Sequence, residues 1–320
     1  MKPRANLTIL FGVLAVLVVS PGGAASAGYR PLNPGQGFDQ APRLAIISAY
    51  APEMEALRAQ ANIEKVVVVN GRSVYVGTLA GHKVLLTLSG ISMVNAAMTT
   101  QALIDRFRVE GIIFSGIAGG VNPGLNIGDV VIPAQWSEYQ EDLFARETEP
   151  GVFTPPDSFE VTLPSYGMMY PQDVDICTVH GAPDEEVPVV WFPVDPAMLQ
   201  VATRVAGTVE LDRCTLEGVC LDTTPVVRPG GNGVSGPTFV DNAGYRDYAW
   251  DTWQAEALDM ESAAVAHVAT VNGVPFIIFR SLSDLAGGGP GENEIDVFFQ
   301  LAADNSAQVM MAFLRAWPKR

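Results

Sequence analysis

Residues 111–120 read GIIFSGIAGG, and this stretch is the most informative one for the fold. Its first half, Gly111–Ser115, is apolar over the length of a strand, which predicts a buried strand. Glycines follow at positions 116, 119, 120 and 124. Glycine weakens the interior of a helix, so we expect these positions to form a loop after the strand.

Apolar runs of strand length alternate with segments of helical periodicity on both sides of this stretch. Asn70-Gly71 joins two such runs and predicts a β-hairpin. The other expected strands cover residues 44–49, 66–69, 74–79, 83–88, 129–132 and 274–279, and the expected helices cover residues 52–61, 93–107, 196–205, 258–271 and 296–316. Strands that alternate with helices predict an α/β domain whose central, largely parallel mixed sheet is flanked by helices.

The N-terminal region has the pattern of an export signal. Lys2 and Arg4 precede an apolar run over residues 9–19, and Ala25-Ser26-Ala27 forms a cleavage site of the A-x-A type. A membrane anchor is the alternative, but the run is short against the ~20 residues that cross a bilayer. We therefore expect a signal peptide over residues 1–27 and a periplasmic or secreted protein with no membrane attachment after cleavage.

The rest of the chain is expected to form a linker and one domain. Residues 28–42 are rich in Gly and Pro, which predicts a linker. The domain covers residues 43–320 and contains a long insertion at about 134–233, where Pro, Gly and acidic residues are dense.

Charge and cysteine content narrow the classes of function. The formal net charge of −16 excludes a nucleic-acid-binding protein, which needs basic residues to replace counterions on phosphates. Cys214 and Cys220 lie close together, so in an oxidising compartment a disulfide between them is the simplest pairing. Cys177 is then left over. No His lies at ligand spacing from the close pair, and no metal or other cofactor is expected.

Three acidic residues follow predicted strands or open predicted helices: Glu53, Glu261 and Asp284. Ligands of α/β sheets collect at the carboxyl ends of the strands, which makes these residues candidates for a site. Each also has a structural explanation. Glu53 and Glu261 favour the positive ends of helices, and Asp284 could cap the loop that follows it.

Six segments in order resemble the methylthioadenosine/S-adenosylhomocysteine nucleosidases of the nucleoside phosphorylase superfamily. They are IISAYAPE (46–53), SGISMVNAA (89–97), GIAGG (116–120), GDVVI (128–132), LDMESAA (258–264) and RSLSD (280–284). The resemblance implies the three-layer fold of that superfamily and an enzyme that cleaves the N-glycosidic bond of purine nucleosides.

The resemblance also implies a role for each matched residue. Asp284 matches the acid that protonates purine N7, and Glu53 matches the base that activates water for attack at C1′. The acid must hold a proton near neutral pH, which burial favours. The positions that match substrate-binding residues are Glu261, Met260, Phe239, Val240, Ser283, Arg280, Ala118 and Gly119. Of these, Glu261 would bind the ribose hydroxyls, Phe239 would stack on the base, and Arg280 would lie near the nucleophile.

Two other functions stay open at this point. A phosphate-dependent purine nucleoside phosphorylase needs cationic anchors for phosphate, but the strand at Gly111–Ser115 carries no basic residue, and Glu53 would repel phosphate. Ile117 stands where the nucleosidases have a small hydroxyl residue, which could change how water is held. A non-catalytic nucleoside-binding or storage protein is the second alternative. Family members associate, so we expect a homo-oligomer, with a dimer favoured.

Overall fold

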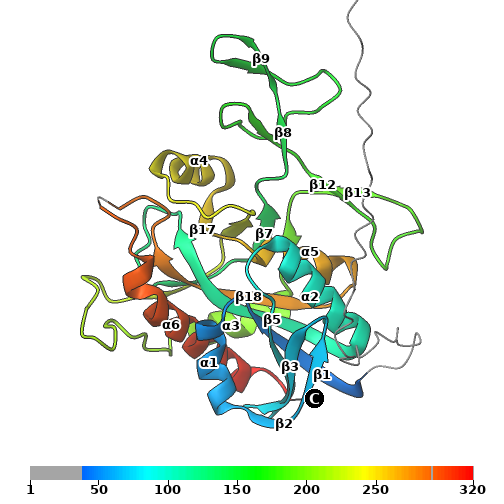
Figure 1. Cartoon of the computed structure of the whole chain (residues 1–320), viewed down its shortest axis with the longest axis vertical. Helices are drawn as coiled ribbons and strands as arrows, with labels where there is room; N and C mark the ends of the chain where they lie inside the picture. The colour runs from blue at the N-terminus through cyan, green and yellow to red at the C-terminus, as the bar shows by residue number, and fades with distance from the viewer. Residues whose placement is uncertain (1–37, 290, 320) are drawn as a thin grey trace, which may run out of the picture. The chain divides into compact units, whose positions relative to one another are not determined.

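The structure is a computed structural model that describes residues 38–289 and 291–319 (Figure 1). The expected signal peptide lies outside the described residues. The helices are α1 (Ala51–Gln60), α2 (Met93–Arg106), α3 (Pro196–Ala206), α4 (Ala243–Trp253), α5 (Ser262–Val271) and α6 (Ile295–Ala316).

The strands that form the central sheet are β1 (Asp39–Ser48), β2 (Asn62–Val69), β3 (Arg72–Leu79), β4 (His82–Leu88), β5 (Phe107–Gly120), β6 (Val130–Ile132), β7 (Gln135–Glu138), β14 (Phe192–Pro193), β15 (Val227–Pro229), β16 (Asn232–Ser235), β17 (Ala255–Asp259) and β18 (Phe276–Asp284). Their order is β14-β7-β16-β17-β5-β1-β4-β3-β2, with β18 paired to β5 and β6, and β15 paired to β6. The pairs β1–β4, β1–β5 and β5–β18 are parallel, and β2–β3, β3–β4 and β5–β17 are antiparallel. The sheet is mixed, as predicted.

Helices cover both faces of the central strands. Successive residues of a strand point to opposite faces of the sheet, and in these strands the residues on both faces are apolar. Ala45 and Ile47 of β1 belong to the apolar cluster that includes α2 and α5. Leu44 and Ile46 belong to the cluster that includes α1, α3 and α6. The structure therefore has three layers, which confirms the predicted fold class.

Two local predictions around the central strands are wrong. The glycines at 116, 119 and 120 do not form a loop, because β5 continues through Gly120 and pairs with β18 up to Gly119. The expected helix over residues 258–271 begins only at Ser262, since Leu258 and Asp259 end strand β17. The hairpin at Asn70-Gly71 is confirmed, with both residues at positive φ (48° and 79°).

Other boundaries also differ from expectation. Strand β1 begins at Asp39, inside the expected linker over residues 28–42, and helix α4 was not predicted. The expected insertion contains the predicted helix near residues 196–205, and it also contributes to the central sheet: β7, β14 and β15 lie within it and β16 overlaps its end. Cys214 and Cys220 are joined by a disulfide, and within the described residues Cys177 is exposed with a free thiol.

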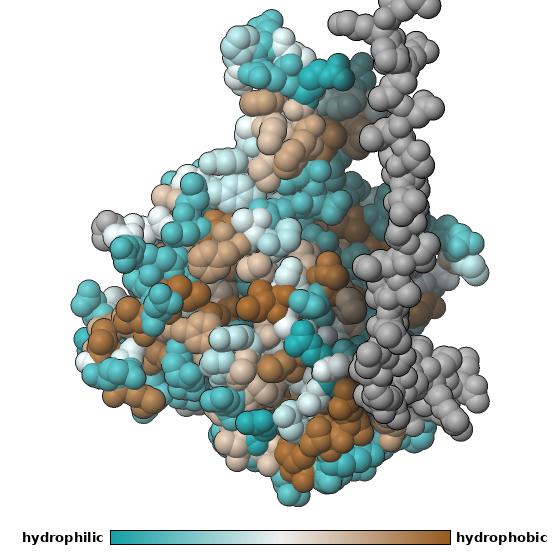
Figure 2. Space-filling view, in the orientation of Figure 1, coloured by the Kyte–Doolittle hydropathy of each residue, from teal (hydrophilic) through white to brown (hydrophobic). Residues whose placement is uncertain are grey.

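Residues 140–190 form an extension beyond the central sheet that we call the arm (Figure 1). It contains the short strands β8 (Asp142–Phe144), β9 (Arg146–Glu149), β10 (Val152–Thr154), β11 (Met169–Pro171), β12 (Val174–Ile176) and β13 (Val187–Val189), which pair in two-stranded sheets. The arm carries eleven Asp and Glu residues against a single Arg. Figure 2 shows a mainly hydrophilic surface at its tip. In the described part of the chain, no helix is long and apolar enough to cross a membrane.

Candidate active site

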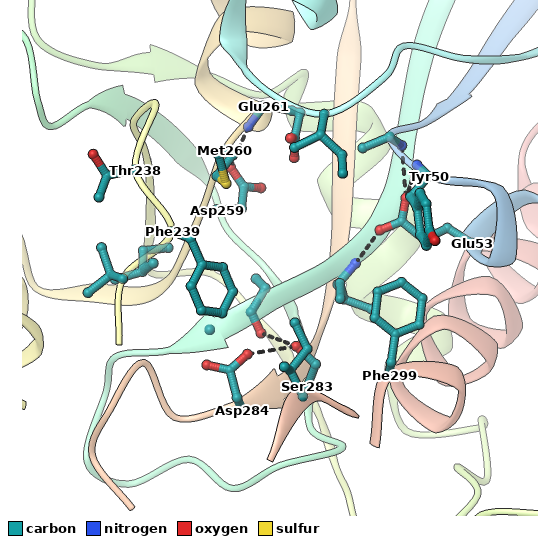
Figure 3. Close-up of a pocket in the computed structure, with 18 residues that line it drawn as sticks. Tyr50, Glu53, Thr238, Phe239, Asp259, Met260, Glu261, Ser283, Asp284 and Phe299 are labelled. Atoms are coloured by element: carbon teal, nitrogen blue, oxygen red, sulfur yellow. Dashed lines mark hydrogen bonds between the residues drawn. The ribbon is translucent and has the colours of Figure 1, made fainter. Parts of the chain in front are cut away.

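One cavity of about 730 Å³, including its open mouth, lies where β1, β5, β17 and β18 end and where α5 and α6 begin (Figure 3). Nine of the ten predicted site residues line it: Glu53, Ala118, Gly119, Phe239, Val240, Met260, Glu261, Ser283 and Asp284. The tenth, Arg280, is fully buried and is not among the lining residues. The carboxyl ends of the strands thus meet at one site, as expected for an α/β sheet.

Glu53 is fixed by the turn between β1 and α1. Its Oε2 accepts hydrogen bonds from the backbone N–H groups of Ala49 and Tyr50, both at 2.8 Å. Its Oε1 accepts one from Ile117 N at 3.0 Å. The side chain is buried, and burial raises the pKa of Glu53, whereas the charge of Arg280 and the three N–H groups lower it. One acceptor position on Oε1 remains open for a further donor.

Asp284 is the last residue of β18 and lies at the opposite side of the cavity from Glu53 in Figure 3. Its Oδ1 accepts hydrogen bonds from Ala286 N at 2.8 Å and from Asn293 Nδ2 at 3.4 Å. Its Oδ2 accepts one from Ser283 Oγ at 2.8 Å. Burial raises the pKa of Asp284, against the opposing effect of these donors. A buried carboxyl group of this kind can hold a proton above the ordinary pKa of Asp.

Glu261 is the N-cap residue of α5 and takes up the third side of the cavity (Figure 3). Its Oε1 accepts a hydrogen bond from Ser92 N at 2.7 Å, and its Oε2 lies 3.5 Å from Arg280 Nη2. Burial raises the pKa of Glu261, the attraction of Arg280 lowers it, and the neighbouring charge of Asp259 raises it further. Each carboxylate oxygen can still accept a hydrogen bond from a ligand hydroxyl.

The apolar wall of the cavity comes from the segment after β16 and from α6. Phe239 is 54% exposed and projects its ring toward the cavity, and Val240 beside it is buried (Figure 3). On the other side, Tyr50 packs edge-on against Phe299 with ring centroids 5.5 Å apart. A flat aromatic ligand can stack on an exposed ring such as that of Phe239.

Sequence reasoning missed several residues of this site. Tyr50, Ile91, Ile295 and Phe299 line the cavity, and so does Asp259, a buried carboxylate beside Arg280. For Tyr50 and Asp259 a signal existed, because each lies inside a segment that carries the family resemblance. Ile295 and Phe299 belong to the amphipathic helix α6, whose pattern does not tell a cavity wall from a core face.

The lining residues include no Lys, Arg or His. Among the described residues, no group of three or more His, Cys, Asp or Glu side chains has an arrangement that would hold a metal ion. The ionisable carboxyl groups that line the cavity are those of Glu53, Asp259, Glu261 and Asp284.

Comparison with known proteins gives the family. The family model of the phosphorylase superfamily matches residues 43–315. A 5′-methylthioadenosine/S-adenosylhomocysteine nucleosidase from Tolumonas auensis is 29% identical over 274 residues, which are 85% of this chain and 99% of the relative. One from Bacillus cereus is 32% identical over 265 residues, which are 83% of this chain and 93% of the relative.

A solved structure agrees with these relatives. The crystal structure of the nucleosidase of the same name from Neisseria meningitidis, in complex with methylthio-immucillin-A, has a TM-score of 0.64 and 28% sequence identity, and the match covers 86% of this chain and 99% of that one. The cavity, the order of the matching segments and these similarities lead to one conclusion: the chain belongs to the phosphorylase superfamily and, within it, to the family of the 5′-methylthioadenosine/S-adenosylhomocysteine nucleosidases.

Proposed function

We propose that this chain is a purine nucleoside N-ribohydrolase, which protonates the purine at N7 while water attacks C1′ of the ribose. The observation that carries the proposal is the presence of two buried carboxyl groups, Glu53 and Asp284, on opposite sides of one cavity, with Glu261 on a third side (Figure 3). The names of the relatives, which are nucleosidases, support the same reaction.

Asp284 is assigned the leaving-group side of the reaction. Its Oδ1 already accepts two N–H donors, whereas Oδ2 accepts only the hydroxyl of Ser283. The proton therefore resides on Oδ2 and passes to N7 as the bond between C1′ and N9 breaks. The pKa of Asp284 is raised by burial, which keeps this proton available. Phe239 stacks on the base, and the backbone of Val240 binds its edge.

Glu53 is assigned the nucleophile side. Three backbone N–H groups fix its carboxylate, and the open acceptor position on Oε1 binds one water molecule. As the C1′–N9 bond lengthens, the water oxygen bonds to C1′ and one water proton passes to Glu53. The products are the free purine and free ribose, or the 5′-substituted ribose. Glu261 accepts hydrogen bonds from the ribose hydroxyls and Met260 packs beside the sugar.

The lining of the cavity favours water over phosphate as the nucleophile. Phosphate is bound in proteins by Arg, Lys or clusters of N–H groups. No basic residue lines this cavity, and Arg280 behind it already faces three carboxylates. A phosphate dianion would therefore meet uncompensated negative charge. Tyr50, Ile91 and Phe299 make the rest of the cavity apolar, which suits an uncharged 5′ substituent such as a methylthio group.

The test is purine release by the purified protein from 5′-methylthioadenosine, S-adenosylhomocysteine, adenosine, inosine and guanosine, with and without phosphate. Release without phosphate, together with free ribose or its 5′-thio derivative, is expected. Strict dependence on phosphate, with a ribose 1-phosphate as product, would make the chain a phosphorylase. Binding of nucleosides without any release would support a binding protein instead.

We also propose that the protein forms a homodimer. Val94 and Met98 of α2 are 69% and 55% exposed, and Ile91 at the cavity is 51% exposed. Met93, Val94, Ala264 and Val268 line an apolar groove between α2 and α5. A second copy that covers this face would remove these side chains from water. Sedimentation equilibrium is expected to give twice the mass of the chain, and Val94→Asp is expected to give the monomer.

Export is proposed from the N-terminal pattern, with cleavage after Ala27. The disulfide between Cys214 and Cys220 fits an oxidising compartment. N-terminal sequencing of the protein recovered from the periplasm or the medium is expected to begin at Gly28, and a protein that stays in the cytoplasm with residue 1 intact would contradict the proposal.

A further inference from the structure

Arg280 is the charged residue on which three carboxylates of the site converge. Its side chain is fully buried and lies over the ring of Phe114, 4.3 Å from the centroid. Its Nε is 2.7 Å from Asp259 Oδ2, its Nη2 is 3.5 Å from Glu261 Oε2, and its Nη1 is 3.9 Å from Glu53 Oε1. The ion pair with Asp259 is the shortest of the three, and the single hydrogen on Nε is donated to Ser262 Oγ, which itself donates to Asp259.

Asp259 differs from the other two carboxylates because its oxygens have no capacity left. Oδ1 accepts hydrogen bonds from Ser235 Oγ at 2.5 Å, from Glu261 N at 3.1 Å and from Ser262 N at 3.0 Å. Oδ2 contacts Arg280 Nε and accepts a hydrogen bond from Ser262 Oγ. A carboxylate accepts about four such bonds, so Asp259 cannot also bind a substrate hydroxyl or a water. Its role must be exerted through its neighbours.

The hydroxyl of Ser262 strengthens the hold on Arg280. It accepts a hydrogen bond from Arg280 Nε at 3.0 Å and donates to Asp259. On the other side of the guanidinium, Nη1 donates to the carbonyl oxygen of Ile117 at 3.1 Å. Nη2 is buried and has no hydrogen-bond partner among the described residues. The guanidinium is thus anchored at Nε and Nη1, while Nη2 is held near Glu261 without bonding to it.

We infer that Asp259 is a positioning residue that holds Arg280 back from Glu53 and Glu261, so that these two carboxylates keep acceptor positions free for the attacking water and for the ribose. The inference rests on the proposed function for its meaning in catalysis. A buried guanidinium without its anchor would move toward the nearest carboxylates, because an unpaired charge in the interior is unfavourable. At direct contact with Arg280, Glu53 would be a weaker base and would have no position left for water.

The effect on pH dependence has a definite sign. Removal of the Asp259 charge favours the ionised form of Glu261, and closer approach of Arg280 favours the ionised form of both Glu261 and Glu53. The pKa of Glu261 and that of Glu53 would therefore fall. The acid limb of the kcat/KM profile, where the base becomes protonated, would move to lower pH. A role in folding alone would lower the amount of active protein equally at every pH.

The experiment compares wild type with Asp259→Asn and Ser262→Ala across the pH range, with Asp129→Asn as the matched control. Asp129 is an equally buried carboxylate that accepts two backbone N–H bonds away from the cavity. We expect Asp259→Asn to lower kcat by about 10²-fold, the effect of misplacing a catalytic group by about 1 Å, and to shift the acid limb to lower pH. Ser262→Ala is expected to lose about 3- to 10-fold, in keeping with one hydrogen bond, with a smaller shift in the same direction. The control keeps the wild-type profile.

A crystal structure gives a readout that does not need activity. In Asp259→Asn, at least one of two distances is expected to shorten to hydrogen-bonding distance. They are the distance between Arg280 Nη1 and Glu53 Oε1, now 3.9 Å, and the distance between Arg280 Nη2 and Glu261 Oε2, now 3.5 Å. If Asp259→Asn does not fold, Ser262→Ala serves for both measurements. Unchanged distances, or an unshifted profile with a uniform loss of activity, would overturn the inference. Absence of purine release by the wild type would instead reject the proposed function, and the crystallographic distances would still decide the positioning role.

Discussion

Asp284→Asn is expected to remove nearly all activity while leaving the fold intact. The reason lies in the donors around this carboxyl group. In the variant, the amide oxygen can take the place of Oδ1 and accept from Ala286 N and Asn293 Nδ2. The amide nitrogen takes the place of Oδ2 and donates to Ser283 Oγ, whose own proton can turn to the carbonyl oxygen of Ala118, 3.4 Å away. Each hydrogen bond made by the carboxyl group thus has a counterpart in the amide, and the transferable proton is lost.

The size of the effect follows from the role of that proton. General acid catalysis typically contributes about 10²- to 10⁴-fold, so the variant should lose that much in kcat, or about 3–5 kcal/mol of transition-state stabilisation. Substrate binding should change little, because the walls of the cavity stay in place.

Stability should also respond in a defined direction. The pKa of Asp284 is raised by burial, so its contribution to stability is present below the unfolded value near 3.9 and is lost as pH rises through the folded pKa. An amide does not titrate. The melting temperature of Asp284→Asn at neutral pH is therefore expected to equal or exceed that of wild type, and the alkaline limb of the wild-type kcat/KM profile should disappear with the acid.

The assay is single-turnover release of adenine from 5′-methylthioadenosine, with thermal denaturation of the same samples. Asp241→Asn is the matched control, since exposed Asp241 also accepts a bond from Asn293, at 3.1 Å, but does not line the cavity. The control should stay within about twofold of wild type, as surface substitutions usually do. The assignment would be refuted if Asp284→Asn kept more than about a tenth of wild-type activity. A loss of less than about tenfold is smaller than the contribution of a general acid.

Three further outcomes are expected. Glu53→Gln should lose about 10²- to 10⁴-fold in kcat. It should also lose about 1–3 kcal/mol of folding free energy, because an amide cannot accept all three backbone N–H bonds that Glu53 accepts. A wild-type free energy of unfolding, measured by chemical denaturation, would contradict this. Gly116→Ala should destabilise the protein by about 1–3 kcal/mol, since its Cβ would lie 2.3 Å from Arg280 Nη1 and 2.5 Å from Glu53 Oε1. Gly207→Ala is the control in the same thermal denaturation experiments, because its Cβ would meet no atom within 4 Å. Adenosine 5′-monophosphate should be a very poor substrate compared with adenosine, because the cavity is lined by four carboxyl groups and by no basic residue. Equal rates of adenine release from both would show that the 5′ phosphate lies away from the negative charge of these carboxyl groups.

The alternation of apolar strands and helices was enough to predict the layers and most central elements. The hairpin at Asn70-Gly71 and the helices α1, α2, α3 and α6 follow from local signals. Helix α4 was missed because its aromatic residues suit a strand as well as a helix. The prediction of a loop at the glycines after Ser115 was wrong. In the structure, Gly116 and Gly119 continue β5 and pair with β18, and at Gly116 a Cβ would come within 2.5 Å of Arg280 and Glu53, which explains a glycine inside this strand.

The sequence identified nine residues that line one cavity in the structure, and their roles in catalysis and binding stay predictions. Glu53, Glu261 and Asp284 do gather around one cavity, although they are far apart in the chain. The resemblance implied a place for Arg280 near the nucleophile, but its pairing with Asp259 was not predictable, because that pairing depends on the register of β18 beside β5 and on the turn between β17 and α5. The same holds for the unassigned Asp259, which in sequence is one more acidic residue before a helix.

The arm divides the molecule into regions of unequal local stability. Its strands have three or four residues each and pair over three positions, and residues 146–152 are all exposed. By contrast, every residue of β18 is buried. Segments with few buried apolar contacts open with a small free energy, whereas central strands open only with the whole fold. We therefore expect the exposed hairpin of β9 and β10 to open with a smaller free energy than the central strands, so that a change in its length or charge leaves the central sheet in place.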